Sequence, residues 1–371
     1  MTKAAELAKM GEVLTNSQIG GRRNIIINGA MQISQRSTSE TGVFDASQYE
    51  TLDRFKINGS TSGRATMTQT ADGPSGFANC LKLACTTADT SIAAGEFGII
   101  RYLIEGQDLQ QIKKGTSDAE KVTISFYVKG NANATYQLEF KDGDNNRVNA
   151  QTFNVTTSWN RIILTFDADT TGAFDDDNAA SVQLNFWLHA GSTYTSGTFT
   201  SNTWQDGSAS DGIRVGSISS FFDSTDRTFF LTGLQMEVGE QATPFEHRSF
   251  GEELNLCRRY FTVLANGSEK INASICPGAY YTANIIFHSV ILPVEMRTAP
   301  SMVTTNGTNY YISFSNGSGD HHDALALGAA GTNRVVEIVA ETNVAATAGH
   351  ATFTRLGGTD ASAKCMLDAE L

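Results

Sequence analysis

The stretch Val122-Thr-Ile-Ser-Phe-Tyr-Val-Lys129 has an apolar side chain at every second position. In an extended chain these side chains share one face: Val122, Ile124, Phe126 and Val128. The stretch Ser181-Val-Gln-Leu-Asn-Phe-Trp-Leu-His189 repeats the pattern. Both stretches are typical of strands in an antiparallel sheet that covers a core with one face and meets water with the other.

The same period of two runs from Asn24 to about Phe245. It predicts further strands at 55–57, 81–85, 97–104, 135–141, 159–166 and 230–238. In the last of these, one face is expected to carry Phe230, Thr232, Leu234, Met236 and Val238. Turn-rich segments at 142–146 and 175–178 separate neighbouring strands. Many half-buried strands without helical patterns between them indicate a two-sheet sandwich, most plausibly a jelly roll.

Two short helices complete the prediction. Residues 1–14 have helical spacing, with one apolar face formed by Leu7, Met10 and Leu14. Ser249-Phe-Gly-Glu252 has the spacing of a capping box and precedes an apolar-rich run. Beyond it, strands are predicted at 283–291, 310–314, 334–339, 351–355 and 363–367.

The expected fold class is therefore all-β: a jelly-roll sandwich followed by a smaller β-sandwich. The predicted parts are an N-terminal helix and linker at 1–23, a jelly roll at 24–248, a connecting helix at 249–262 and a C-terminal β domain at 263–371.

Composition supports this fold class and excludes several functions. Of 371 residues, 40% are hydrophobic and only 18% are charged, which disfavours disorder and long helical bundles. The net charge of −12 disfavours nucleic acids and anionic membranes as partners. No apolar stretch approaches the ~20 residues of a membrane span. The first residues lack the long apolar segment of a secretory signal, so we expect none.

Motifs for catalysis or metal binding are weak. The sequence has no Gly-x-Ser-x-Gly elbow, phosphate loop, dinucleotide fingerprint or His-Glu-x-x-His, and we expect neither enzymatic activity nor a cofactor. The five cysteines fit no zinc pattern, and we expect five reduced thiols. Asp142-Gly-Asp-Asn-Asn146 begins like a calcium loop, but Arg147 stands where a glycine is required, so a hairpin turn is favoured. The acidic run 175–177 is treated as a solvated loop.

The adjacent pair His321-His322 is the remaining weak metal candidate. Neighbouring side chains of a strand point to opposite faces, so one chain would supply only one of these histidines. Three chains around an axis could supply three, whereas the alternative is a polar loop without metal. No metal site is predicted from one chain alone.

Aromatic side chains on polar strand faces suggest a sugar site. Tyr127 and Trp187 lie on the faces opposite the apolar ones, and Asn185 and His189 flank Trp187. In sugar-binding sites an aromatic ring stacks on the pyranose, and amide and imidazole groups form hydrogen bonds with the hydroxyls of the sugar. Trp204 would add a wall from a turn-rich segment. The alternative is that Tyr127 and Trp187 lie beneath a loop or a second subunit.

Several blocks of sequence stand in a fixed order along the chain: residues 24–36, Tyr49, 53–55, 101–106, 122–129, 234–249, 252–261, 292–300 and 369–371. Together these blocks resemble a family of bacteriophage fibre and virion structural proteins of marine and cyanobacterial phages. The resemblance implies a central domain like the jelly roll of carbohydrate-binding modules, a variable C-terminal fibre tip and a homotrimer without catalysis. It also implies assembly in the host bacterial cytoplasm and a final location in the virion.

We therefore expect a phage tail fibre subunit, a trimeric adhesin that contacts host-surface polysaccharide through several weak sites. Residues 1–23 would anchor the fibre to a tail or capsid protein through Leu7, Met10 and Leu14. One alternative is a head fibre or capsid decoration protein with a structural role only. A carbohydrate-binding module of a secreted bacterial enzyme is a third, less favoured possibility.

Overall fold

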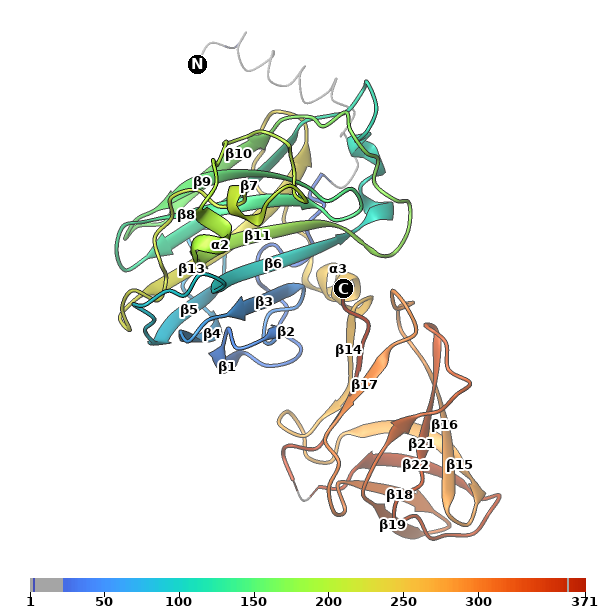
Figure 1. The fold of residues 1–371 in the computed structure, drawn as a ribbon. Coiled ribbons are helices and arrows are strands. Elements are labelled where there is room, and N and C mark those ends of the chain that lie inside the picture. The colour runs from blue at the N-terminus through green and yellow to red at the C-terminus, as the bar shows by residue number, and fades with distance from the viewer. Residues whose placement is uncertain (1–2, 4–22, 359) are drawn as a thin grey trace. The chain divides into compact units, whose positions relative to one another are not determined.

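The computed structural model describes residue 3, residues 23–358 and residues 360–371. The chain divides into an N-terminal unit, Met1–Phe250, and a C-terminal unit, Gly251–Leu371 (Figure 1). The predicted N-terminal helix with Leu7, Met10 and Leu14 lies outside the described residues. Within the described part of the chain, no helix is long and apolar enough to cross a membrane.

The N-terminal unit is a sandwich of two antiparallel sheets whose neighbouring strands are often distant in sequence (Figure 1). The six-stranded sheet has the order β1 (Ser39–Val43), β4 (Arg64–Thr70), β5 (Cys80–Thr87), β13 (Thr228–Val238), β7 (Val122–Gly130) and β10 (Asn160–Phe166). The seven-stranded sheet has the order β12 (Gln205–Asp206), β9 (Arg147–Val155), β8 (Ala134–Asp142), β11 (Ala180–Ala190), β6 (Phe97–Glu105), β3 (Phe55–Ser60) and β2 (Ser47–Tyr49). The expected all-β class and jelly-roll sandwich are confirmed.

The core lies between the two sheets and uses the alternating residues that the sequence indicates. Phe126 of β7 and Phe186 of β11 are fully buried and meet edge to face, with ring centroids 5.1 Å apart. Phe153 of β9 contacts both rings, at 5.1 and 6.2 Å. Edge-to-face packing suits the charge distribution of aromatic rings and adds to the gain from burying each side chain.

Strand β13 departs from the predicted alternation. Its pairing with β7 shifts register between Thr232 and Gln235, around Gly233 at a φ of +63°. A Cβ at Gly233 would approach the rings of Phe77 and Tyr127 to 2.8 Å, so a side chain would clash there. The shift reverses which positions face inward. The core therefore receives Phe229 and Leu231 before the shift, and Leu234 and Met236 after it. The expectation that Phe230 and Thr232 share the core face was wrong.

Several elements of this unit carry no clear period in the sequence. Strands β1, β2, β4, β9 and β12 were not predicted. Strand β9 shows why the pattern fails. Its alternate positions on the core side hold polar residues, Arg147, Asn149 and Gln151, before the apolar Phe153 and Val155. Short helical turns lie in the connections: η1 (Gly106–Asp108), η2 (Gln110–Ile112), α2 (Ser192–Thr195) and η3 (Asp211–Ile213).

The C-terminal unit is a second, smaller β-structure with its own core. Its three-stranded sheet contains β14 (Phe261–Asn266), β23 (Lys364–Asp368) and β17 (Ser301–Thr304). Its seven-stranded sheet has the order β19 (Ser318–His322), β18 (Tyr311–Ser315), β22 (Ala351–Leu356), β15 (Ser274–Thr282), β16 (Ile285–Ile291), β21 (Val335–Ala340) and β20 (Ala326–Leu327). All five strands predicted beyond the connecting helix are present.

The predicted helix near residue 250 is present but shorter than expected. Helix α3 spans Phe250–Arg258, and strand β14 begins at Phe261. The expected end at residue 262 was wrong, because Phe261 and Thr262 pair with Asp368 and Leu367 of β23. Hydrogen bonding between β14 and β23 therefore ends the helix before these residues, although the spacing of Tyr260 and Phe261 fits a helix. All five cysteines are buried and unpaired, as predicted.

Candidate functional site

The five predicted sugar-binding residues do not form one site. Tyr127 lies on β7 of the six-stranded sheet, where its half-buried ring packs on Phe77 with centroids 5.2 Å apart. Asn185, Trp187 and His189 lie on β11 of the seven-stranded sheet. The register places Tyr127 and Trp187 on faces turned away from the core that the two sheets share, so these side chains are on opposite sides of the sandwich.

Trp204 is separate from both groups. Its ring packs on Phe140 with centroids 5.2 Å apart and borders the main core. Its indole nitrogen donates a hydrogen bond to the carbonyl of Asp167 at 2.7 Å. Trp204 therefore closes one edge of the sandwich.

A long segment between β11 and β13 covers half of the outer face of the seven-stranded sheet. It contains α2 and η3, which lie over β11 and β8 in Figure 1. Beneath it Trp187 is 1% exposed, with Tyr194 at 5.1 Å between ring centroids and the Arg214 guanidinium carbon 5.1 Å from its ring. Asn185 and His189 are fully buried. The expected open face at Asn185, Trp187 and His189 is thus corrected: a loop occupies it.

A buried carboxylate organises this covered half. Glu139 of β8 accepts hydrogen bonds from Arg214 at 2.8 and 2.9 Å, from Asn185 at 2.7 Å and from the Trp187 indole at 3.2 Å. Burial acts to raise the pKa of Glu139, but the charge and hydrogen bonds of Arg214 hold that pKa below its usual range. Glu139 is therefore an anion that fixes the covering segment to the sheet through Arg214.

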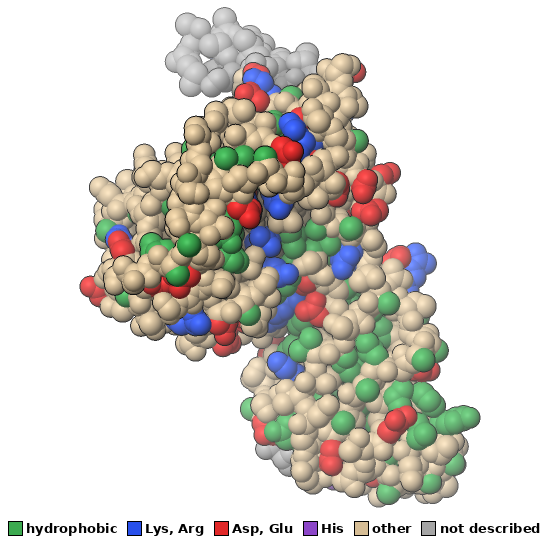
Figure 2. All heavy atoms as spheres, viewed as in Figure 1, with side chains coloured by type: hydrophobic (Ala, Val, Ile, Leu, Met, Phe, Trp, Pro, Cys, Tyr) green, Lys and Arg blue, Asp and Glu red, His purple; other side chains and the backbone are tan. Residues whose placement is uncertain are grey.

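The other half of the same face, the open half, carries partly exposed cations. We call Lys56, Arg101 and Lys141 the basic strip. Their strands are adjacent: Lys56 of β3 pairs with Arg101 of β6, and Lys141 of β8 pairs with Gln183 of β11. Lys56, Arg101, Lys141 and Gln183 are half-buried. Figure 2 shows Lys and Arg side chains gathered on this side of the N-terminal unit.

Two of these cations, Arg101 and Lys141, have few acceptors among the described residues. Arg101 donates through Nε to the side-chain oxygen of Asn185 at 2.8 Å, while within the described residues its two terminal nitrogens make no hydrogen bond. In the same described set, Lys141 makes no hydrogen bond or ion pair. The terminal nitrogens of a guanidinium form a planar fork that matches a carboxylate or sulfate group.

The electrostatics of the strip favour an anion. Burial lowers the pKa of Arg101, and the Arg214 charge lowers it further against the opposing effect of Glu139. Burial also lowers the pKa of Lys141, with added repulsion from Arg214. Arg101, Lys141 and Arg214 thus repel one another. The nearby Glu139 carboxylate forms its ion pair with Arg214. A ligand with negative groups would relieve the repulsion.

Sequence reasoning missed this strip because cross-strand neighbours cannot be assigned without the strand order. The available signal was a cation at an outward position in each of three strands: Lys56, Arg101 and Lys141. Only the register β3-β6-β11-β8 places them on one surface.

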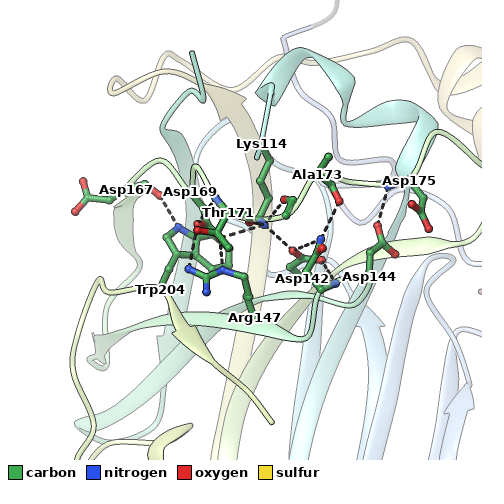
Figure 3. A network of polar contacts seen from close by, with 12 residues as sticks. Lys114, Asp142, Asp144, Arg147, Asp167, Asp169, Thr171, Ala173, Asp175 and Trp204 are labelled. Carbon is green, nitrogen blue, oxygen red and sulfur yellow. Dashed lines mark hydrogen bonds and ion pairs between the residues drawn. The ribbon is translucent and has the colours of Figure 1, made fainter. Parts of the chain in front are cut away.

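The acidic loops form a different arrangement from a calcium site (Figure 3). As expected, Asp142 and Arg147 bound a hairpin turn between β8 and β9. The ammonium of the buried Lys114 lies 2.6 Å from Asp142 and 3.1 Å from Asp169. It also donates to the carbonyls of Thr171 and Gly172, at 2.7 and 2.8 Å. A protein cation therefore occupies the centre of this oxygen cluster.

The weak metal candidates His321 and His322 face opposite sides of β19, as adjacent strand residues must. His321 is exposed and His322 is fully buried. His322 belongs to a neutral chain of hydrogen bonds. Its Nε2 lies 3.0 Å from the Ser313 hydroxyl, which lies 2.6 Å from Thr354, and Thr354 lies 2.6 Å from His288. Burial lowers the pKa of His322 to about 4, with repulsion from His288 as the next cause, so the ring is neutral at pH 7.

Comparisons with known proteins give structural neighbours alone. No family model matches the sequence, and no curated protein matches it. A carbohydrate-binding module of family 4 has a TM-score of 0.30 and 14% identity, covering 57% of this chain and 97% of its own. The xylan-binding family 22 module of Paenibacillus barcinonensis Xyn10C has a TM-score of 0.28 and 11% identity, covering 59% and 96%. A family 11 module from Clostridium thermocellum, in complex with a mixed-linked tetrasaccharide, has a TM-score of 0.28 and 11% identity, covering 56% and 99%. At these values the similarity carries no argument about what this chain binds.

Proposed function

We propose that the chain is a subunit of a phage tail fibre and that its jelly-roll unit binds a negatively charged polysaccharide of the host surface. The activity is binding without catalysis, and the site is the basic strip. The single observation that carries the proposal is the fork of Arg101, whose terminal nitrogens have no acceptor among the described residues. Lys141 lies on the same outer face, two strands away.

The chemistry of the strip suits an acidic sugar polymer. Strands β6 and β8 lie on either side of β11. Two strand spacings are about 10 Å, so the Arg101 and Lys141 side chains can meet negative groups on successive sugars of one polymer. Gln183, half-buried between them, offers an amide for hydroxyl groups. The net charge of −12 would repel an anionic polymer elsewhere on the surface, so binding depends on this local cluster.

A homotrimer is the second part of the proposal, and the C-terminal unit supports it. Three large apolar side chains of its seven-stranded sheet are strongly exposed: Tyr281 (69%), Ile291 (80%) and Phe353 (48%). Figure 2 shows hydrophobic side chains gathered on this unit. Large exposed apolar side chains on one sheet favour an interface between chains. Together with the sequence blocks that resemble fibre proteins, it supports a virion-attached trimer anchored through residues 1–23.

A glycan array tests the proposed ligand class. The full chain is applied to neutral, carboxylated and sulfated polysaccharides, beside Arg101→Gln and the control Lys121→Gln. Lys121 is a surface cation paired with Asp167 and Glu240 away from the strip. We expect binding to acidic polymers, lost in Arg101→Gln and kept in Lys121→Gln. Binding to neutral glycans alone, or to no glycan, contradicts the proposal, and the latter favours a structural head fibre or decoration protein.

Light scattering tests the assembly. A trimer has three times the chain mass of 39.9 kDa, whereas a monomer of 39.9 kDa at micromolar concentration contradicts the fibre proposal.

A further inference from the structure

Three potential metal ligands converge at one end of the seven-stranded sheet. Asp89 and Glu96 come from the connection between β5 and β6, and His189 comes from β11. One ligand atom from each lies within 4.8 Å of the other two. Asp89 is 4% exposed, His189 is fully buried, and Glu96 is half-buried. The cluster is thus enclosed on two sides and reaches solvent at Glu96.

The His189 imidazole is aimed into this cluster with an unsatisfied nitrogen. Its Nδ1 lies 2.8 Å from the hydroxyl of Ser220, and its ring packs edge-on against Phe222 with centroids 5.3 Å apart. Its Nε2 is buried without a hydrogen-bond partner and lies 3.8 Å from the Asp89 carboxylate, too far for a hydrogen bond. A buried polar atom without a partner is unfavourable unless a ligand satisfies it.

The two carboxylates are held in place by the backbone and by a hydroxyl. Thr61 donates to Asp89 at 2.7 Å, and the amides of Ser62 and Ala93 donate to Glu96 at 3.2 and 2.6 Å. Burial acts to raise the pKa of Asp89, but hydrogen bonds, led by that of Thr61, hold the pKa below its usual range. Burial lowers the pKa of His189, while the charge of Asp89 acts to raise it.

We propose that Asp89, Glu96 and His189 bind one Zn²⁺ ion. Zinc accepts imidazole nitrogen and carboxylate oxygen at about 2.0–2.2 Å, and three protein ligands plus one water complete its tetrahedron. Two ligand atoms of such a tetrahedron are about 3.3 Å apart, so the separation of 3.8 Å between Nε2 and the Asp89 oxygen closes with a small side-chain movement. Ser220 then acts as the outer partner that fixes the ring orientation.

The choice of zinc follows from the donor set. Calcium takes six to eight oxygen ligands and magnesium an octahedron of oxygens, whereas this cluster offers a nitrogen and two carboxylates. A nitrogen donor beside carboxylates suits zinc better than either hard cation. The site would connect the β5–β6 connection to the end of β11, outside the basic strip, so it is independent of glycan binding.

The test is zinc binding by the full-length protein after removal of metals with a chelator. Isothermal titration with ZnCl₂ and elemental analysis give affinity and stoichiometry for the wild type, Glu96→Gln and His189→Gln. Glu120→Gln is the matched control, since Glu120 is a half-buried carboxylate of the same unit that pairs with Lys113. Because His189 is buried, Glu96→Gln is the variant that preserves the fold, and circular dichroism verifies folding of each protein.

We expect one zinc ion per chain, at least tenfold weaker binding in Glu96→Gln and unchanged binding in Glu120→Gln. Co²⁺ titration adds a direct signature, because a four-coordinate nitrogen and oxygen site gives visible absorption bands that Glu96→Gln should lose. The proposal is overturned if the wild type binds no zinc at 100 µM, if Glu96→Gln binds zinc as tightly as wild type, or if Ca²⁺ alone binds.

Discussion

The two halves of the outer face of the seven-stranded sheet use similar residue types for different purposes. In the covered half, Trp187 and Asn185 surround the buried Glu139 beneath the segment that carries Arg214. In the open half, Arg101 and Lys141 have nitrogens without acceptors among the described residues. A polar strand face becomes structural where a loop supplies its partners and stays available for a ligand where none does. The difference predicts that substitutions in the covered half change stability, whereas those in the open half change binding.

The largest effect is expected from Glu139→Gln in the covered half. The substitution leaves the mostly buried Arg214 guanidinium without its carboxylate, and breaking a buried ion pair costs about 3–5 kcal/mol. Urea unfolding of the N-terminal unit measures the loss. The pH dependence checks the cause. The folded-state pKa of Glu139 is held below its ordinary value. The ionised carboxylate therefore adds to the free energy of unfolding of the wild type above pH ~4.5, and this contribution is lost as the pH falls further. The variant should lack that component, and an unchanged free energy of unfolding would contradict the structural role.

The buried His322 and the exposed His321, neighbours on β19 of the C-terminal unit, give a second comparison of this kind. The unfolded chain binds a proton at His322 near pH 6.5, whereas the folded-state pKa is about 4. Stability should therefore fall by roughly 3 kcal/mol as the pH drops from 6.5 to 4. His322→Asn should flatten this dependence, and His321→Gln, at an exposed position, should leave it intact. Denaturant unfolding of the C-terminal unit at several pH values measures it, and equal behaviour of both variants would argue against the buried chain.

A smaller loss is expected from Trp187→Phe. The change keeps an aromatic ring between Tyr194 and Arg214 but removes the hydrogen bond to the charged Glu139. Hydrogen bonds to charged groups contribute about 1.5–3 kcal/mol, which sets the expected loss of stability. Affinity for acidic polysaccharide should stay unchanged under conditions where the variant is folded. Loss of glycan binding in a folded variant would instead restore the sugar-stacking role predicted for Trp187 from the sequence.

The smallest effect on stability is expected from Lys141→Gln. Lys141 makes no hydrogen bond or ion pair within the described residues, so its removal should change the free energy of unfolding by no more than about 0.5 kcal/mol. Thermal unfolding provides the measurement. A loss above 1 kcal/mol would show that the open half also holds the fold together.

The sequence predicted the fold far better than the site. Alternation identified β7, β8, β11 and most of β6, because one face of each strand meets a continuous core. It failed at Gly233, where a register shift exchanges the two faces of β13, and at β9, where polar residues occupy inner-face positions. Trp187 was assigned correctly to the outer face, but nothing in its own strand indicates that a segment closed by Arg214 lies over it. Arg101 and Lys141 become neighbours only through the strand order.

The central claim is that the open half binds an acidic polysaccharide through the fork of Arg101 and the charge of Lys141. The direct measurement is calorimetric titration of the purified full-length protein with oligomers of a uronic acid at low and at physiological salt. We predict binding by wild type and Lys121→Gln that weakens as salt rises, and at least tenfold weaker binding by Arg101→Gln and Lys141→Gln. Equal affinity in all four proteins, or binding that salt does not affect, would contradict the account.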